Sequence, residues 1–108
     1  MSRSGDEAHP ASGDVIGALF AIVEERKAER PEGSYTASLL DHEKGENAVL
    51  EKLGEELTEV VLAAKDGDRD AVAHESADLV YHLLVLFAAM DMDVADLEAE
   101  LLDRFPEE

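Results

Sequence analysis

The sequence contains no cysteine and no tryptophan, and only 5% of its 108 residues are aromatic. Without cysteine the chain can form no disulfide, no thiolate zinc site and no cysteine nucleophile. A core without large aromatic rings must be built from Leu, Val, Ala and Ile, and this composition favours helices over sheets. Because 45% of the residues are hydrophobic, we expect an all-α fold with one core.

Basic residues are also scarce, since 9 Lys and Arg against 27 Asp and Glu give a formal net charge of −18. Nucleic acids and anionic membranes attract positive surfaces, so we expect neither as a direct partner. So large a charge repels itself in a compact chain, and salt screens that repulsion. A salt-rich cytoplasm is therefore our hypothesis, and loss of fold or activity on dialysis to low salt would support it.

The chain shows no targeting or membrane-spanning pattern. Residues 1–13 are polar and lack the apolar segment of a signal peptide, so we interpret them as a disordered tail before a single domain over residues 14–108. The longest nearly apolar run, residues 79–90, is shorter than the roughly 20 residues that a bilayer requires. We therefore expect a cytoplasmic protein.

Hydrophobic periodicity predicts an antiparallel bundle of four to five helices. Asp14 is expected to cap the first helix, and Pro31 to end it. Thr36 is expected to cap a short helix over residues 37–44, which Gly45 would end.

The third and fourth helices are expected over residues 46–65 and from residue 68 or 70 to 90. The Asp- and Gly-rich turn between them should make the two antiparallel. An EF-hand starting at Asp66 is excluded, because Ala71 and Ala77 stand where that loop needs Gly and Glu. The apolar arc of the third helix is predicted to face the core: Leu50, Leu53, Leu57, Val60, Val61 and Ala64.

The fourth helix is apolar around nearly its whole circumference from residue 79 to 90. Such a helix must be buried on all sides, which one small chain can hardly achieve. We therefore predict a homo-oligomer, most simply a dimer, with this helix at its centre. A last helix over residues 94–104 is expected to begin at a cap, Asp93, and to turn four residues inward: Val94, Leu97, Leu101 and Leu102.

Two groups of carboxylates mark the helical hairpin. Glu55, Glu56 and Glu59 share one arc of the third helix beside the core stripe, and Glu75 and Asp78 share one face of the fourth. One residue in four is acidic, so an isolated ExxE is almost expected by chance. The two pairs together, followed directly by an apolar helix where surface charge is costly, favour a divalent-cation site such as one for Mg²⁺.

Several polar residues are candidates for binding a substrate, and each has a structural alternative. Cations at the end of the first helix either offset local charge there or bind phosphate. The three adjacent hydroxyl residues 34–36 either cap a helix and pack against it or bind an anion. The histidine of the fourth helix, His82, either lies hydrogen-bonded in the core or contacts a ligand. The candidates are Arg26, Lys27, Ser34, Tyr35, Thr36, Lys52 and His82.

Four segments occur in a familiar order: an Arg-Lys pair at residues 26–27, SYT with a following LL, KLGEELTEVVLAAK at 52–65, and ESADLVYHLLVL at 75–86. With these segments, the sequence resembles the phosphoribosyl-ATP pyrophosphatases of histidine biosynthesis, a branch of the MazG-like nucleotide pyrophosphohydrolases. The ExxE–spacer–ExxD pattern is specific only to the superfamily, whereas the other segments indicate the histidine-pathway branch.

The resemblance implies hydrolysis of the bond between the α- and β-phosphates of 1-(5-phosphoribosyl)-ATP, and a dimer of helical bundles. It implies Mg²⁺ held by Glu56, Glu59, Glu75 and Asp78, with Glu55 nearby. Either Glu56 or Glu59 would be the general base. Lys52, Arg26 and Lys27 would contact phosphates, and the three hydroxyl residues 34–36 would shape the nucleotide pocket.

Two rival interpretations remain at this point. A house-cleaning hydrolase of non-standard nucleoside triphosphates would use the same acids. A non-enzymatic acidic helical protein would explain the charge but neither the SYT segment nor the position of the acids. The cyclohydrolase that is fused to this family in some lineages uses cysteine-bound zinc, so this cysteine-free chain is expected to lack that step.

Overall fold

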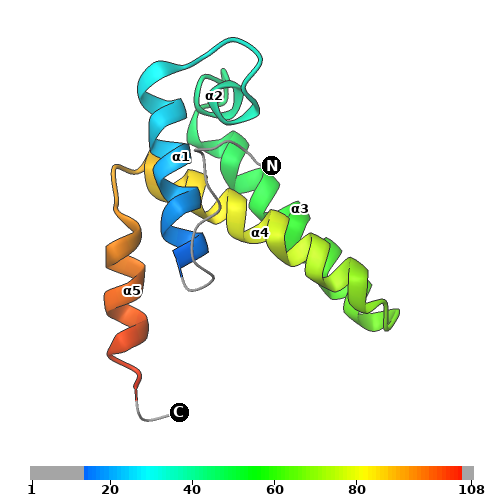
Figure 1. Cartoon of the computed structure of the whole chain (residues 1–108). Helices are drawn as coiled ribbons and strands as arrows, with labels where there is room; N and C mark the ends of the chain where they lie inside the picture. Colours follow the sequence, from blue (N-terminus) through cyan, green and yellow to red (C-terminus); the bar gives the residue numbers. More distant parts are fainter. Residues whose placement is uncertain (1–13, 106–108) are drawn as a thin grey trace, which may run out of the picture.

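The computed structural model describes residues 14–105, and the tail predicted over residues 1–13 lies outside them. Within the described part, five helices and no strand confirm the predicted all-α bundle (Figure 1). The helices are α1 (Val15–Glu29), α2 (Tyr35–Leu40), α3 (Glu46–Lys65), α4 (Arg69–Ala89) and α5 (Val94–Leu102).

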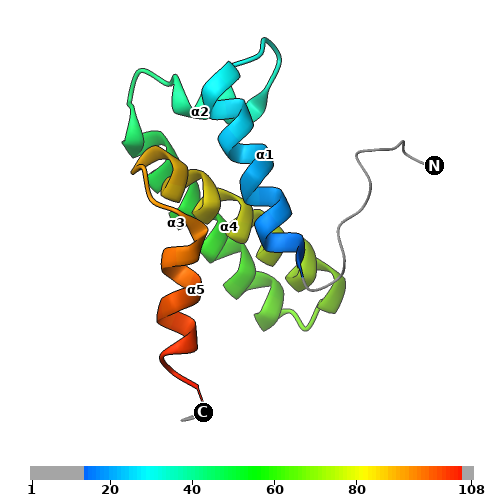
Figure 2. The same ribbon diagram turned by 60° about the vertical axis from the view of Figure 1, so that its left-hand side comes forward.

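The antiparallel hairpin of α3 and α4 is the longest part of the structure, and the two helices lie side by side in both views (Figures 1 and 2). Gly67 has a positive φ of 73° in the turn between them, a conformation that glycine adopts without steric cost. The Asp68 side chain then accepts a hydrogen bond of 3.0 Å from the Ala71 amide and caps α4. The predicted bounds of both helices are confirmed.

The core lies where α1 crosses the C-terminal half of α4, with α2 and the start of α3 closing one end (Figure 2). Leu84, Val85 and Ala88 of α4 are fully buried. Each such Leu or Val side chain contributes about 1.5–3 kcal/mol through burial. The remaining buried members of the core are Phe20, Val23, Leu39, Val49 and Val94.

The short second helix begins earlier than the sequence predicted. Ser34, not Thr36, is its N-cap, and the Ser34 hydroxyl accepts a hydrogen bond of 3.1 Å from the Ala37 amide. Thr36 lies inside the helix, is buried and bonds to a tyrosine instead. The helix ends at Leu40, and Gly45 is the N-cap of α3 rather than the end of α2.

The buried face of α3 differs from the predicted one. Leu50, Leu57 and Val61 are each about half exposed, at 46%, 54% and 51%. The buried line instead joins Val49, Glu56 and Ala63 at intervals of seven residues, which is nearly two helical turns. The apolar arc of α3 is wider than one neighbouring helix covers, so Leu50 and Leu57 face outward in the single chain, whereas Leu53 packs against the core.

The last helix, α5, stands away from the hairpin (Figures 1 and 2). Val94 is buried, but Leu101 and Leu102 are exposed, which corrects their predicted inward position. An apolar groove of about 310 Å³ separates α5 from α1 and α4, so the C-terminal half of α5 lacks a neighbour among the described residues. Its start is fixed by a capping box between Asp93 and Asp96.

The fourth helix is long and apolar enough, by length and composition alone, to cross a membrane. Its N-terminal half nevertheless carries Glu75 and Asp78, and it packs along α3 and α1, as a core helix does. Only its C-terminal half supplies fully buried residues, and Met90 at its end is half exposed. The single chain therefore leaves part of α4 uncovered.

Candidate functional site

Three carboxylates of the hairpin converge on one point. One oxygen each of Glu56, Glu75 and Asp78 lie within 4.8 Å of one another, and we call these residues the acid triad. Glu56 is only 9% exposed because it occupies the buried line of α3, and the two α4 acids are half-buried. Because Glu75 and Asp78 are three residues apart, they share the α4 face that meets α3.

The triad carries unbalanced negative charge. The pKa of Glu75 is raised, first by its partial removal from water and then by repulsion from Glu59, Glu56 and Asp78, against a lowering effect of His74. The His74 imidazole lies 3.7 Å from the Asp78 carboxylate, and His74 is largely exposed. This charge distribution favours a bound cation at the triad.

One lysine approaches the triad. The Lys52 ammonium lies 3.2 Å from the Glu55 carboxylate and 3.7 Å from that of Glu56. Its pKa is raised, chiefly by the hydrogen bond to Glu55 and further by Tyr35 and Glu56, while burial opposes the shift. Lys52 therefore stays charged at neutral pH and balances only part of the triad's charge.

The residues present fit a hard divalent cation. The triad offers only carboxylate oxygens, which suit Mg²⁺ or Ca²⁺ better than the softer transition metals. Glu56 is a nearly buried carboxylate whose one close cation is already shared with Glu55. Glu55 and Glu59 are exposed at the edge of this group, and Glu59 is near enough to raise the pKa of Glu75.

Two tyrosines and a histidine form an aromatic cluster where α2 meets α4. The Tyr35 and Tyr81 rings are stacked with centroids 6.1 Å apart, and the His82 ring stands edge-on to both, at 5.8 Å and 4.9 Å. The Thr36 hydroxyl hydrogen-bonds the Tyr81 hydroxyl. The pKa of Tyr81 is raised, mainly by burial, while Thr36 and the positive charge of Arg26 oppose the rise.

The hydrogen bonds of His82 define its tautomer. A carbonyl oxygen only accepts, so His82 Nδ1 donates to the Asp78 carbonyl at 2.8 Å. In the neutral ring Nε2 is then an acceptor, and the Tyr35 hydroxyl donates to it at 3.1 Å. His82 is 4% exposed, so the structure places it as a hydrogen-bonded core histidine, one turn beyond a triad acid.

The predicted cationic patch divides into two. Arg26 pairs with Glu25 at 3.0 Å and lies on the Tyr81 side. The Lys27 ammonium donates to the Ala88 carbonyl at 2.7 Å and to the Asp91 carboxylate at 2.5 Å. Because Ala88 follows Asp78 by ten residues, Lys27 is about 15 Å along α4 from that acid.

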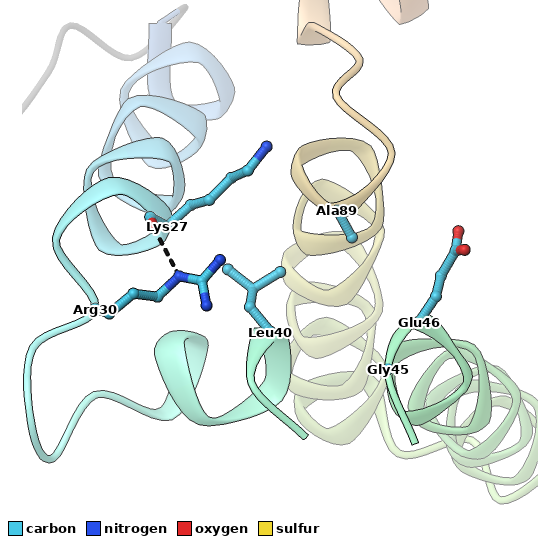
Figure 3. Close-up of a pocket in the computed structure, with 6 residues that line it drawn as sticks. All are labelled: Lys27, Arg30, Leu40, Gly45, Glu46 and Ala89. Carbon is cyan, nitrogen blue, oxygen red and sulfur yellow. Dashed lines mark hydrogen bonds between the residues drawn. The ribbon is translucent and has the colours of Figure 1, made fainter. Parts of the chain in front are cut away.

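A small cavity of about 150 Å³ lies at this second location (Figure 3). Arg30 lines it together with Lys27, and Arg30 pairs in turn with Asp41. We call Lys27, Arg30, Asp41 and Asp91 the paired cluster. Each of its cations has a carboxylate partner, so it ties α1 to the loops after α2 and α4.

Sequence reasoning missed Tyr81 and His74. Tyr81 lies in the apolar run over residues 79–90, whose pattern indicates only a buried helix, although its place next to His82 is a signal. His74 precedes Asp78 by four residues, a spacing that brings two side chains together on a helix. The pairing of Lys27 with Asp91 had no such local signal, because 64 residues separate them.

An all-α domain whose hairpin gathers the acids of an ExxE and an ExxD segment defines the class of MazG-like nucleotide pyrophosphohydrolases. Within that class, residues 17–105 match the family described as phosphoribosyl-ATP pyrophosphohydrolase, and the chain belongs to that family. It is therefore a hydrolase of a phosphoric anhydride bond, and the non-enzymatic interpretation is wrong.

The chain is 68% identical over 93 residues to a phosphoribosyl-ATP pyrophosphatase of Haloarcula marismortui, covering 86% of this chain and 95% of that protein. It is 64% identical over 92 residues to one of Halobacterium salinarum, covering 84% of this chain and 97% of the relative. It is also 50% identical to a histidine biosynthesis bifunctional protein of Gloeobacter violaceus, with 94% of this chain matching 44% of that protein.

Proposed function

We propose that this enzyme hydrolyses 1-(5-phosphoribosyl)-ATP to 1-(5-phosphoribosyl)-AMP and pyrophosphate with Mg²⁺, as the second step of histidine biosynthesis in the cytoplasm. The observation that carries the proposal is the acid triad, three carboxylates within 4.8 Å with one nearly buried. The relatives named for this activity support the choice of substrate.

The triad residues Glu56, Glu75 and Asp78 would hold Mg²⁺, with Glu55 and Glu59 at its edge. When bound, Mg²⁺ neutralises phosphate charge, polarises the scissile phosphoryl group and lowers the pKa of a water. Of the two candidate bases, Glu56 would hold the metal, so Glu59, which is exposed beside the triad, would accept the proton. The water oxygen would bond to the α-phosphorus, the bridging P–O bond would break with its electrons passing to the departing pyrophosphate, and Glu59 would take the water proton.

Cations of the chain orient the substrate phosphates. Lys52 stands next to Glu56, and Arg26 lies on the Tyr81 side of α1, so both would reach oxygens that a metal leaves uncovered. The Lys27 ammonium is committed to Asp91 and the end of α4 and would contribute less. Because the chain carries a charge of −18, these few cations matter for attracting a polyanionic substrate.

A homodimer would complete the bundle. The outward stripe of Leu50, Leu57 and Val61 on α3 is half exposed, and the single chain also leaves part of α4 uncovered. Contiguous exposed apolar surface of this kind is typical of a protein–protein interface. A two-fold partner that covers both helices would bury this surface.

The test is pyrophosphate release from phosphoribosyl-ATP at high salt, with and without Mg²⁺, for the wild type and for Glu59→Ala. We expect Mg²⁺-dependent release that the substitution abolishes. Glu98→Ala, an exposed acid on α5, is the matched control and should keep full activity. No release from a well-folded wild type, together with turnover of a deoxynucleoside triphosphate, would instead support the house-cleaning interpretation.

A further inference from the structure

The ring of Tyr35 combines exposure with fixation. Tyr35 is 50% exposed, yet its hydroxyl is bonded to the buried His82 and its ring is stacked against Tyr81. An exposed aromatic ring costs free energy when it is left in water, and here both the hydroxyl and one face of the ring are held in place. The structure thus presents one flat apolar surface in a defined orientation.

The position of this ring relates it to the acid triad. His82, which accepts the hydrogen bond from Tyr35, lies about one helical turn after Asp78, or about 6 Å along α4. On the α3 side, the Lys52 ammonium lies 3.7 Å from the Glu56 carboxylate of the same triad. A molecule with its phosphates at Lys52 and the triad would therefore have its other end near Tyr35.

We infer that Tyr35 is the stacking surface for the nucleobase of the substrate, and that Tyr81 is a positioning residue that sets the orientation of this ring. Every nucleobase has a flat π-face, and stacking on an aromatic side chain contributes about 1–3 kcal/mol per base. Tyr81 supplies the ring behind Tyr35 and, through its hydroxyl bond to Thr36, holds α2 on α4. This inference rests on the proposed function for the identity of the nucleotide.

The chain contains a built-in reporter for the test. It has two tyrosines and no tryptophan, so its tyrosine emission is not masked by tryptophan and comes from Tyr35 and Tyr81. Two probes separate the base from the phosphates: phosphoribosyl-AMP carries the base, and pyrophosphate does not. We expect phosphoribosyl-AMP to quench tyrosine emission in the full-length protein with Mg²⁺, and saturating pyrophosphate to leave it nearly unchanged.

Substitutions then assign the two roles. Tyr35→Leu should weaken phosphoribosyl-AMP binding, measured by calorimetry, about 5- to 150-fold, and Tyr35→Trp should restore it. Tyr81→Phe, which keeps the ring but loses the bond to Thr36, should raise KM for phosphoribosyl-ATP more than it lowers kcat. Phe105→Leu, at an exposed aromatic beyond α5, is the control and should change neither. Pyrophosphate affinity should be the same in all four variants.

Wild-type affinity for phosphoribosyl-AMP in Tyr35→Leu would overturn the inference, as would equal quenching by pyrophosphate. Equal losses of kcat and of pyrophosphate affinity in Tyr81→Phe would show a general structural role and would overturn its assignment as a positioning residue. The proposed function fails separately, if the wild type releases no pyrophosphate from phosphoribosyl-ATP. In that case, binding of AMP that depends on Tyr35 would still support Tyr35 as a stacking surface for a purine base.

Discussion

Two groups of charged residues lie along α4, and they differ in balance. In the paired cluster near its C-terminus, Lys27 has Asp91 and Arg30 has Asp41. In the acid triad, three carboxylates lie together and Lys52 is the main cation near them. Lys52 also pairs with Glu55, so it neutralises only part of their charge. Paired charges stabilise a fold modestly, whereas charges of one sign held together cost stability until a cation binds. This difference agrees with the proposal that the paired cluster stabilises the fold and that the acid triad takes part in the reaction.

Removing one triad carboxylate should have the largest effect on activity and so test the contrast between the two groups most strongly. Asp78→Asn keeps the shape of the side chain but removes its charge, so we expect kcat/KM to fall by about 100-fold or more. The fold should persist, because the substitution relieves repulsion. Far-UV circular dichroism and pyrophosphate release measure the two effects. Unchanged activity in a folded variant would contradict the assignment of the triad.

Adding the cation should stabilise the triad in a pH-dependent way. The pKa of Glu75 is higher in the folded protein than in the unfolded chain. Protonated Glu75 therefore favours folding at pH values below the unfolded pKa, and this contribution is lost as pH rises through the folded pKa. Metal binds only the deprotonated acids, so thermal stabilisation by Mg²⁺ should be greatest near neutral pH. At 100 times its dissociation constant the gain is about 2.7 kcal/mol, on the order of 10 °C in Tm.

The control for this measurement is Glu75→Gln, which should lose most of the stabilisation by Mg²⁺ at every pH. In the wild type, the stabilisation should shrink on acidification at a higher pH than an ordinary glutamate would require, because the Glu75 pKa is raised. A shift in Tm that is the same at pH 4 and pH 7 would contradict the role of the triad.

Disrupting the paired cluster should have the smallest effect, and on stability rather than on chemistry. Lys27→Met removes the bonds to Ala88 and Asp91 and should lower the free energy of unfolding by about 1 kcal/mol. The pKa of Asp91 is lowered by Lys27, so this pairing stabilises the fold above the usual aspartate pKa and is lost as pH falls through the folded value.

Urea unfolding at several pH values measures that effect. The difference between wild type and Lys27→Met should be constant near neutral pH and should narrow in acid. Activity should change less than in Asp78→Asn. A loss of activity as large as that of the triad variant, without a loss of stability, would place Lys27 on the substrate instead.

Much of this arrangement follows from sequence. Caps and helix breakers predicted the hairpin well, because Asp68 and Gly67 act through neighbours only a few residues away. The buried face of α3 was not predictable from the sequence, because its wide apolar arc allows several rotations of the helix about its own axis. Packing against the other helices determines that the line through Glu56 is buried. The partners of Lys27 and Tyr81 were also hidden, because hydrogen bonds between distant residues leave no local pattern.

The position of Glu56 has one more consequence. It occupies the middle of the buried line between Val49 and Ala63, a place that stability alone would fill with an aliphatic side chain. Under the proposed function, an aliphatic residue in place of Glu56 should give a more stable protein that no longer catalyses the reaction. We therefore propose that the requirement for catalysis, and not stability, retains the carboxylate at this position.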